Sequence, residues 1–180
     1  IDPEILAREL AAQLAGDPLD EIEIDETDDD LVNSSKECDL ALKWLQSGNE
    51  ERLQGLRVFC EHRDPRALPF LVPLLDEPSP VVRMSAVYAL GRNPCPQAID
   101  LLLHLLRFDS NAYVRKATAW SLGNYSDAAV LGPLIDALKQ DVAAVRLWAS
   151  SSLAEVGRNS AESSFPAAKQ LLESLQVDGE

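Results

Sequence analysis

The chain has 180 residues, of which 30 are acidic and 16 are basic, so its formal net charge is -14 at pH 7. This charge argues against a nucleic-acid-binding protein, because neutralising phosphates requires clustered Lys and Arg, and it disfavours docking on anionic lipid. A hydrophobic content of 46% supports a folded core and excludes wholesale disorder. The longest apolar stretch, 67–75, is too short to span a bilayer, and the first residues show no signal-peptide pattern. We therefore expect a soluble cytoplasmic protein without membrane insertion.

The first thirty residues divide into an expected helix and an acidic segment. Apolar residues recur at helical spacing over 1–15 and predict a short N-terminal helix. We assign residues 16–33 to a linker, because nine of the fourteen residues in 17–30 are acidic and none is basic. Such a charge run is typical of a solvated linker. The alternative is a segment that docks on a basic partner or on the protein's own groove.

A motif of ten residues recurs along the chain, at 82–91, 114–123 and 145–154, in steps of 32 and 31 residues. Each copy follows a leucine-rich segment, and a weaker copy lies one period upstream. Because a single helix pair cannot bury its apolar faces, such repeats predict stacked pairs. We expect an all-α fold, an α-solenoid of about four helical hairpins with an N-terminal helix and a C-terminal capping helix. The expected units are 34–63, 64–95, 96–125 and 126–158, and the expected cap is 165–176.

Two residue types predict local features of these units. Gly91 and Gly123 stand where the second helix of a unit ends, so we expect left-handed residues there. Pro73 lies in the middle of a leucine-rich segment and predicts a kink, because it cannot donate a helical hydrogen bond.

The repeated motif resembles HEAT repeats, and more narrowly the HEAT-like repeats of cyanobacterial phycobilisome lyase subunits. It consists of Val82-Arg83, Ala86 and Leu90-Gly91, and it returns in the second copy with Thr in the Ala place; the third copy departs from it at its final glycine. The resemblance covers about residues 36–176. It implies a setting in the cyanobacterial cytosol or plastid stroma. It also implies a partner such as a phycobiliprotein or another photosynthetic component, or an iron–sulphur assembly protein.

Arginine recurs at one motif position, as Arg83, Arg115 and Arg146, each a few residues after an acid. In HEAT repeats generally, such residues form an Asp–Arg ladder that ties the loops of neighbouring units together, and we expect the same here. The alternative is a basic strip for an anionic ligand.

The side of each second helix opposite its core positions carries apolar, aromatic and basic residues. Second helices line the concave surface of such arrays, and Tyr, Trp, Met and Arg are frequent in interface hot spots. The alternative is that these positions pack against the next repeat. The predicted partner-binding residues are Leu53, Arg57, Met84, Tyr88, Lys116, Trp120, Leu147 and Trp148.

Catalytic and metal-binding patterns are almost absent from the sequence. His62 and His104 belong to no close ligand set, and the i, i+4 pair of Asp100 and His104 is a spacing that helices produce by chance. We expect no catalytic residues, no metal and no cofactor. The predicted function is a non-catalytic adaptor that binds another protein through its concave face. The alternative, implied by the resemblance, is a phycobilin lyase or chaperone subunit that handles a bilin and acts on phycobiliproteins.

Overall fold

The computed structural model describes residues 28–159, which form four successive helix pairs. In each unit a first helix, preceded by a 3-10 turn in the last three units, is followed by a second helix. The first helices are α2 (Asp28–Trp44), α4 (Leu68–Leu71) with the 3-10 helix η3 (Val72–Asp76), α6 (Ile99–Phe108) and α8 (Leu131–Gln140). The second helices are α3 (Asn49–Glu61), α5 (Pro80–Arg92), α7 (Ala112–Leu122) and α9 (Ala143–Asn159).

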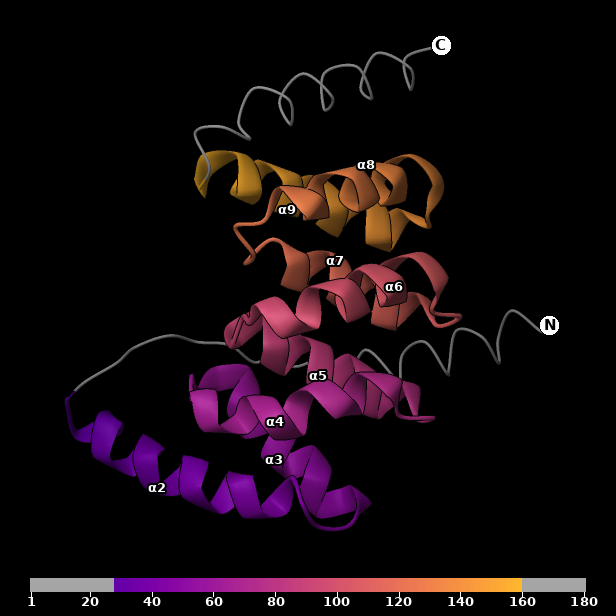
Figure 1. Ribbon diagram of the computed structural model, residues 1–180. Coiled ribbons are helices and arrows are strands. Elements are labelled where there is room, and N and C mark those ends of the chain that lie inside the picture. The colour runs from indigo at the N-terminus through magenta and orange to yellow at the C-terminus, as the bar shows by residue number, and fades with distance from the viewer. Residues whose placement is uncertain (1–27, 160–180) are drawn as a thin grey trace.

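The pairs stack in chain order, as Figure 1 shows from α2 at one end to α8 and α9 at the other. Within the layer of second helices, α3 packs on α5, α5 on α7 and α7 on α9. In the other layer α6 packs on α8, and each first helix also packs on the second helix of its own unit. The predicted all-α solenoid is confirmed.

Leucines at equivalent positions build the core between the layers. Leu71, Leu102 and Leu134 of the first helices are fully buried. The second helices contribute equally buried leucines at equivalent positions, Leu90, Leu122 and Leu153. Burying one such side chain stabilises the fold by about 1.5–3 kcal/mol, so the repeated pattern supplies similar cohesion at every interface.

Capping side chains and a proline mark the starts of the first helices. Asp64 accepts a hydrogen bond from the Arg66 amide at 2.9 Å, and Asp127 accepts one from the Ala129 amide at 2.8 Å. Each bond satisfies an amide that a helix start leaves without a helical acceptor. In the third unit the turn η4 (Pro96–Ala98) starts with Pro96, which has no amide hydrogen to satisfy.

At Pro73, where we expect a kink, the structure shows a change of helix type. The α-helix α4 ends at Leu71, and the chain continues from Val72 as a 3-10 helix. Proline lacks the amide that would continue the α-helical pattern, so the tighter 3-10 turn replaces it.

The expectation for Gly91 and Gly123 is wrong. No described residue has a positive φ; Gly91 lies inside α5, and Gly123 has φ -63° and ψ -20°. Glycine is required there because neighbouring second helices approach closely. A Cβ on Gly91 would collide with the Trp120 ring, and a Cβ on Gly123 would lie 2.6 Å from the Ser152 hydroxyl oxygen.

The first unit begins earlier than expected, because α2 starts at Asp28 and includes residues assigned above to the acidic linker. The predicted helix 1–15, most of the linker 16–33 and the predicted cap 165–176 lie outside the described residues. Within 28–159, no helix is long and apolar enough to cross a membrane.

Candidate protein-binding face

Accessible side chains on the second helices α3, α7 and α9 make up a surface that we call the second-helix face, and its members are Leu53, Arg57, Lys116, Trp120, Leu147 and Trp148. The helix α7 shows how the sequence builds it. Val114, Ala117 and Leu122 are fully buried toward the core and the neighbouring helices. Lys116 and Trp120 stand about one helical turn apart on the other side of α7, and both remain partly exposed. The 3.6-residue period thus separates a packed side from a surface side.

The structure places six of the eight predicted binding residues on accessible surface. Leu147 is 66% exposed and Arg57 is exposed, which puts accessible side chains at both ends of the second-helix face. The four half-buried members are Leu53, Lys116, Trp120 and Trp148.

The other two predicted residues are buried, so the expectation that they are exposed is wrong. Met84 is 7% exposed and Tyr88 is 1% exposed. One reason is a cross-helix aromatic contact: the Tyr88 and Trp120 rings lie 5.4 Å apart between centroids, at an interplanar angle of 60°. Tyr88 therefore supports the second-helix face from beneath.

Trp120 is held in place by its neighbours. One side of its indole lies over Gly91, where no side chain could fit, and another meets the Tyr88 ring. Aromatic contacts of this kind favour defined geometries and add about 0.5–1.5 kcal/mol beyond simple burial. The exposed part of the indole is thus a rigid, preorganised feature of the surface.

Charged residues dominate a different surface, the edge formed by the loops within each unit. Arg83 donates to both carboxylate oxygens of Asp109, at 2.8 and 3.0 Å. Arg115 donates to both oxygens of Asp141, at 2.7 Å each. Both pairs join one unit to the next. Each is bidentate, with two parallel hydrogen bonds, and this geometry makes an Arg–carboxylate interaction stronger than a single hydrogen bond. These residues form the predicted Asp–Arg ladder.

The same guanidinium groups also fasten the loop of their own unit. Arg83 donates to the carbonyls of Glu77 and Pro78 at 2.8 and 3.0 Å, and Arg115 donates to the carbonyl of Asp109 at 2.9 Å. The guanidinium nitrogens of each arginine therefore donate both to a carboxylate of the next unit and to loop carbonyls of their own unit. This favours the ladder over the alternative of a basic strip for an anionic ligand.

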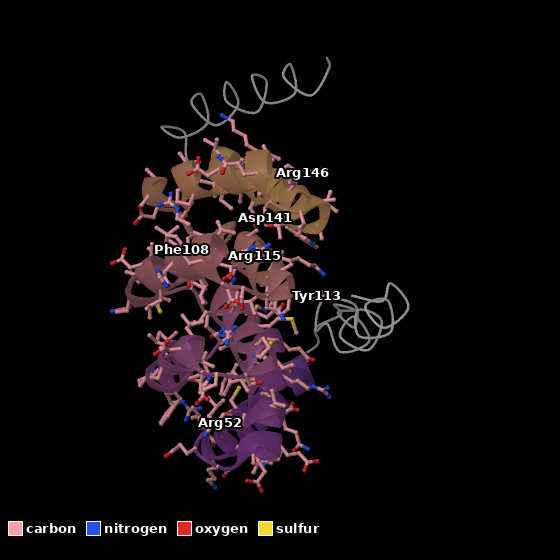
Figure 2. All side chains as sticks on the ribbon, turned by 90° about the vertical axis from the view of Figure 1, so that its right-hand side faces the viewer. Arg52, Phe108, Tyr113, Arg115, Asp141 and Arg146 are labelled. Atoms are coloured by element: carbon pink, nitrogen blue, oxygen red, sulfur yellow. The ribbon has the colours of Figure 1, made fainter. Side chains whose placement is uncertain are left out.

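The ladder changes at its ends. In the first unit Arg52 bonds Glu77 at 3.1 Å, so the partner acid is Glu77 and not the neighbouring Asp76. In the last unit Arg146 is exposed, and within residues 28–159 it donates one hydrogen bond, to the Asp141 carbonyl at 3.0 Å. Figure 2 looks onto this edge, where the labelled ladder residues form one column: Arg52, Arg115, Asp141 and Arg146.

The electrostatics of the Arg115–Asp141 pair reflect its geometry. Burial by itself would raise the pKa of Asp141, but hydrogen bonds from Arg115 and the Val142 amide outweigh it. The pKa of Asp141 therefore lies below its ordinary value of 3.8. The hydrogen bonds to Asp141 in turn raise the pKa of Arg115. Both groups are charged at neutral pH and neutralise each other.

A hollow of about 630 Å³ opens beside this pair, between α6, α8 and the loop that follows α8. Its charged lining is paired: Arg115 bonds Asp141 at 2.7 Å, and Arg107 lies 3.2 Å from Asp136. The hollow therefore offers no unbalanced charge for fixing an ionic ligand, and it lies away from the second-helix face.

Sequence reasoning missed an exposed apolar patch on the first-helix side. Leu101 and Phe108 of α6 are 41% and 65% exposed, and the Phe108 ring packs on the His104 ring, 5.0 Å away between centroids and tilted by 47°. Figure 2 shows Phe108 on the opposite side of the ladder from Tyr113 of α7. The available signal was position: Leu101 and Phe108 stand seven residues apart, so they share one side of α6, which is not the side of its buried leucines.

Asn93 is a second residue that sequence reasoning missed. Its amide nitrogen donates to the carbonyls of Phe59 and His62 at 3.0 Å each, and its oxygen accepts from the Asp64 amide at 2.8 Å. Asn93 is buried, so these bonds satisfy backbone groups at the end of α3 that water cannot reach. Its role is to join the first two units.

The chemistry-bearing side chains of the described region are dispersed. Cys38, Cys60 and Cys95 are free and buried, and the Cys60 thiol donates to the Ser85 carbonyl at 3.7 Å. His62 lies 3.6 Å from Glu37. Between residues 28 and 159, no three His, Cys, Asp or Glu residues gather in a way that could hold a metal ion.

Comparison with known proteins agrees with this architecture. The family model for HEAT repeats matches residues 39–122 and, in a second overlapping match, residues 99–179. No curated protein matches the chain. HEAT repeats indicate a scaffold for protein–protein interaction. The narrower resemblance to phycobilisome lyase subunits, and the bilin-handling alternative that accompanies it, stay predictions. The stacked helix pairs, the Asp–Arg ladder and the family match together show that the chain belongs to the HEAT-repeat family.

Proposed function

We propose that this protein is a non-catalytic adaptor that binds another protein through its second-helix face. The observation that carries the proposal is the contrast in how side chains are used. The ladder arginines Arg83 and Arg115 form hydrogen bonds within the protein, whereas Trp120, Leu147 and Arg57 present accessible surface on the second-helix face.

The form of this face suits recognition of a protein segment. Trp120 is a partly exposed aromatic anchor fixed by Gly91 and Tyr88, so little conformational entropy would be lost when a partner covers it. Trp and Arg are the residue types most enriched in binding hot spots. Lys116, on the same helix as Trp120, and Arg57, on α3, add positive charge to the face. A segment with apolar side chains flanked by acids fits this combination.

The cellular setting follows from the resemblance of the repeat motif. We place the adaptor in the cyanobacterial cytosol or plastid stroma, with a phycobiliprotein, another photosynthetic component or an iron–sulphur assembly protein as its partner. What supports this setting is the Val-Arg, Ala and Leu-Gly spacing of the repeats, as at Val82, Ala86 and Leu90.

The test is capture of partners from soluble cyanobacterial extract by the immobilised full chain and by two matched variants. Trp120→Ala with Leu147→Ser removes the apolar surface of the second-helix face. Leu101→Ser with Phe108→Ala removes exposed apolar surface from the first-helix side. We expect a partner that is retained by the wild type and by the second variant and is lost with the first. Equal capture by both variants, with both folded, would refute the proposal.

A further inference from the structure

The Asp–Arg ladder has one arginine that bonds no acid in the part of the chain that the structure describes. Arg83 and Arg115 each donate through Nε and Nη2 to both oxygens of a carboxylate in the next unit. Arg146 is the equivalent residue of the last unit, and within residues 28–159 it bonds a backbone carbonyl only. Figure 2 shows it beyond Asp141, at the end of the labelled column. We call Arg146 the open rung.

The open rung is fastened to its own loop in the same way as the inner rungs. Nη1 of Arg146 donates to the Asp141 carbonyl at 3.0 Å, as Nη1 of Arg115 donates to the Asp109 carbonyl at 2.9 Å. Because the guanidinium group is planar, this bond also orients Nε and Nη2, the two donors that hold a carboxylate in the inner rungs. An acid that docks on Arg146 therefore meets donors that are already in place, which lowers the entropy lost on binding.

The surface around the open rung is apolar. Arg146 is the only charged residue in 142–154. Val142 and Leu147, on either side of it in the chain, are 48% and 66% exposed. A partner that covers these side chains also removes water from the guanidinium group. A cation that loses its water without gaining an acceptor is costly, so a partner that fits this surface must bring an acid.

A second copy of this chain does not supply that acid by stacking head to tail. In the second unit the ladder acid Glu77 stands three residues before the second helix begins, whereas in the first unit this place is held by Gln46. The next residue, Ser47, contributes its backbone carbonyl, which accepts from Arg52 at 3.3 Å. The loop that would meet Arg146 in such a stack thus carries no carboxylate at the ladder position.

We infer that Arg146 binds an Asp or Glu carboxylate of a partner protein, beside apolar side chains of the partner that cover Leu147. The inference rests on the adaptor function proposed above and locates the acid of the partner. Arg146 and Leu147 are successive residues of α9, so they point to neighbouring sides of the helix, about 100° apart. One partner segment can therefore contact the loop edge and the second-helix face together. Two parallel hydrogen bonds to one carboxylate also fix the direction in which the partner lies.

Arginine modification tests the open rung in the free full-length protein. The reagent is phenylglyoxal, the probe for the site is acetate, and mass spectrometry gives the modification rate at each arginine. We expect Arg146 to react faster than Arg115, whose guanidinium bonds a carboxylate. Acetate should slow Arg146 more than Arg63, an exposed arginine of the first unit, and sodium chloride at the same ionic strength should slow both equally.

Two results of this experiment would overturn the inference. Equal slowing of Arg146 and Arg63 by acetate would mean that the open rung has no preference for a carboxylate. A rate at Arg146 as low as that at Arg115 would mean that another part of the chain already bonds it.

Charge reversal then tests the carboxylate of the partner. The probe is the partner that the full chain captures, labelled and titrated with each variant. Arg146→Glu should weaken binding by about a hundredfold, because it places two carboxylates against each other. Arg146→Lys should weaken it by about tenfold, because lysine keeps the charge but cannot form the bidentate pair. Arg63→Glu makes the same change in net charge in the first unit and is the matched control, with affinity close to wild type. An effect of Arg146→Glu no larger than that of Arg63→Glu would refute the inference.

The test of the second-helix face separates this inference from the function on which it rests. If Trp120→Ala with Leu147→Ser abolishes capture and Arg146→Glu binds normally, the open rung is refuted and the adaptor function stands. If Arg146→Glu weakens binding and the Trp120 and Leu147 variant captures normally, the second-helix face is refuted and the open rung stands. Self-association of the wild type that Arg146→Glu abolishes, measured by sedimentation velocity, would assign the carboxylate to a second copy and contradict the inference.

Discussion

The loop edge and the second-helix face of this protein use their side chains in opposite ways. On the loop edge, Arg83 and Arg115 donate hydrogen bonds to a carboxylate of the next unit and to carbonyls of their own loop. On the second-helix face, Trp120 and Leu147 leave apolar surface uncovered. One surface holds the stack together, and the other is available for recognition. Cohesion between the units and the accessible apolar surface therefore come from different positions of the same repeat motif.

The largest effect expected on the loop edge comes from breaking an inner rung of the ladder. Arg115→Met leaves the Asp141 carboxylate, 13% exposed, without its guanidinium partner. We expect a loss of about 3 kcal/mol in the free energy of unfolding, measured by urea denaturation. Arg146→Met is the matched control and should cost less than about 0.5 kcal/mol, because Arg146 is exposed and bonds a single carbonyl within residues 28–159. Equal losses would contradict the distinction between inner and terminal rungs.

A somewhat smaller effect is expected where the second helices meet. Gly91→Ala forces a methyl group against the Trp120 ring and should destabilise the protein by about 1–3 kcal/mol. Gly132→Ala is the control, because Gly132 lies in α8 with open space around it. The helix propensity of alanine and the crowding of its Cβ by the ring of Pro133 oppose each other, so the free energy of unfolding should change by less than about 1 kcal/mol. In a Trp120→Ala background the Gly91→Ala penalty should shrink. A penalty that persists unchanged would mean that Trp120 is not the reason for the glycine.

The ladder also predicts a pH dependence with a defined sign. Because the pKa of Asp141 is lower in the folded protein than its ordinary value of 3.8, the pair stabilises the fold at neutral pH. That contribution should disappear as the pH falls below about 4 and through the folded pKa. Asp64, whose pKa is lowered mainly by its hydrogen bond with Arg66, adds in the same direction. The Arg115→Met variant should lose part of this acid sensitivity, measured as thermal midpoint against pH. An identical slope in both proteins would contradict the account.

The smallest effect on stability is expected on the second-helix face. Leu147→Ser and Arg57→Ser alter exposed side chains, so each should change the free energy of unfolding by less than about 0.5 kcal/mol. The same variants should weaken partner binding, which titration of a labelled partner would measure. A stability loss as large as that of Arg115→Met would show that this face, too, serves internal cohesion.

The repeat period predicted the fold and the ladder, because both depend on spacing within the chain. The wrong expectations for Met84, Tyr88 and Gly91 have a common physical cause. The helical period shows which side of one helix is apolar, but Met84, Tyr88 and Gly91 also respond to neighbouring helices, whose distance the sequence does not state. The partner of Arg52 likewise depends on loop geometry, since Glu77 and Asp76 are adjacent in the chain.

Site-specific photo-crosslinking tests the central claim most directly. A photoreactive side chain would replace Leu147 on the second-helix face in one protein and Phe108 on the first-helix side in another, both positions being about two-thirds exposed. The proteins would then be irradiated together with the captured partner. The account predicts a cross-link from position 147 and none from position 108. Cross-linking from position 108 alone would contradict it.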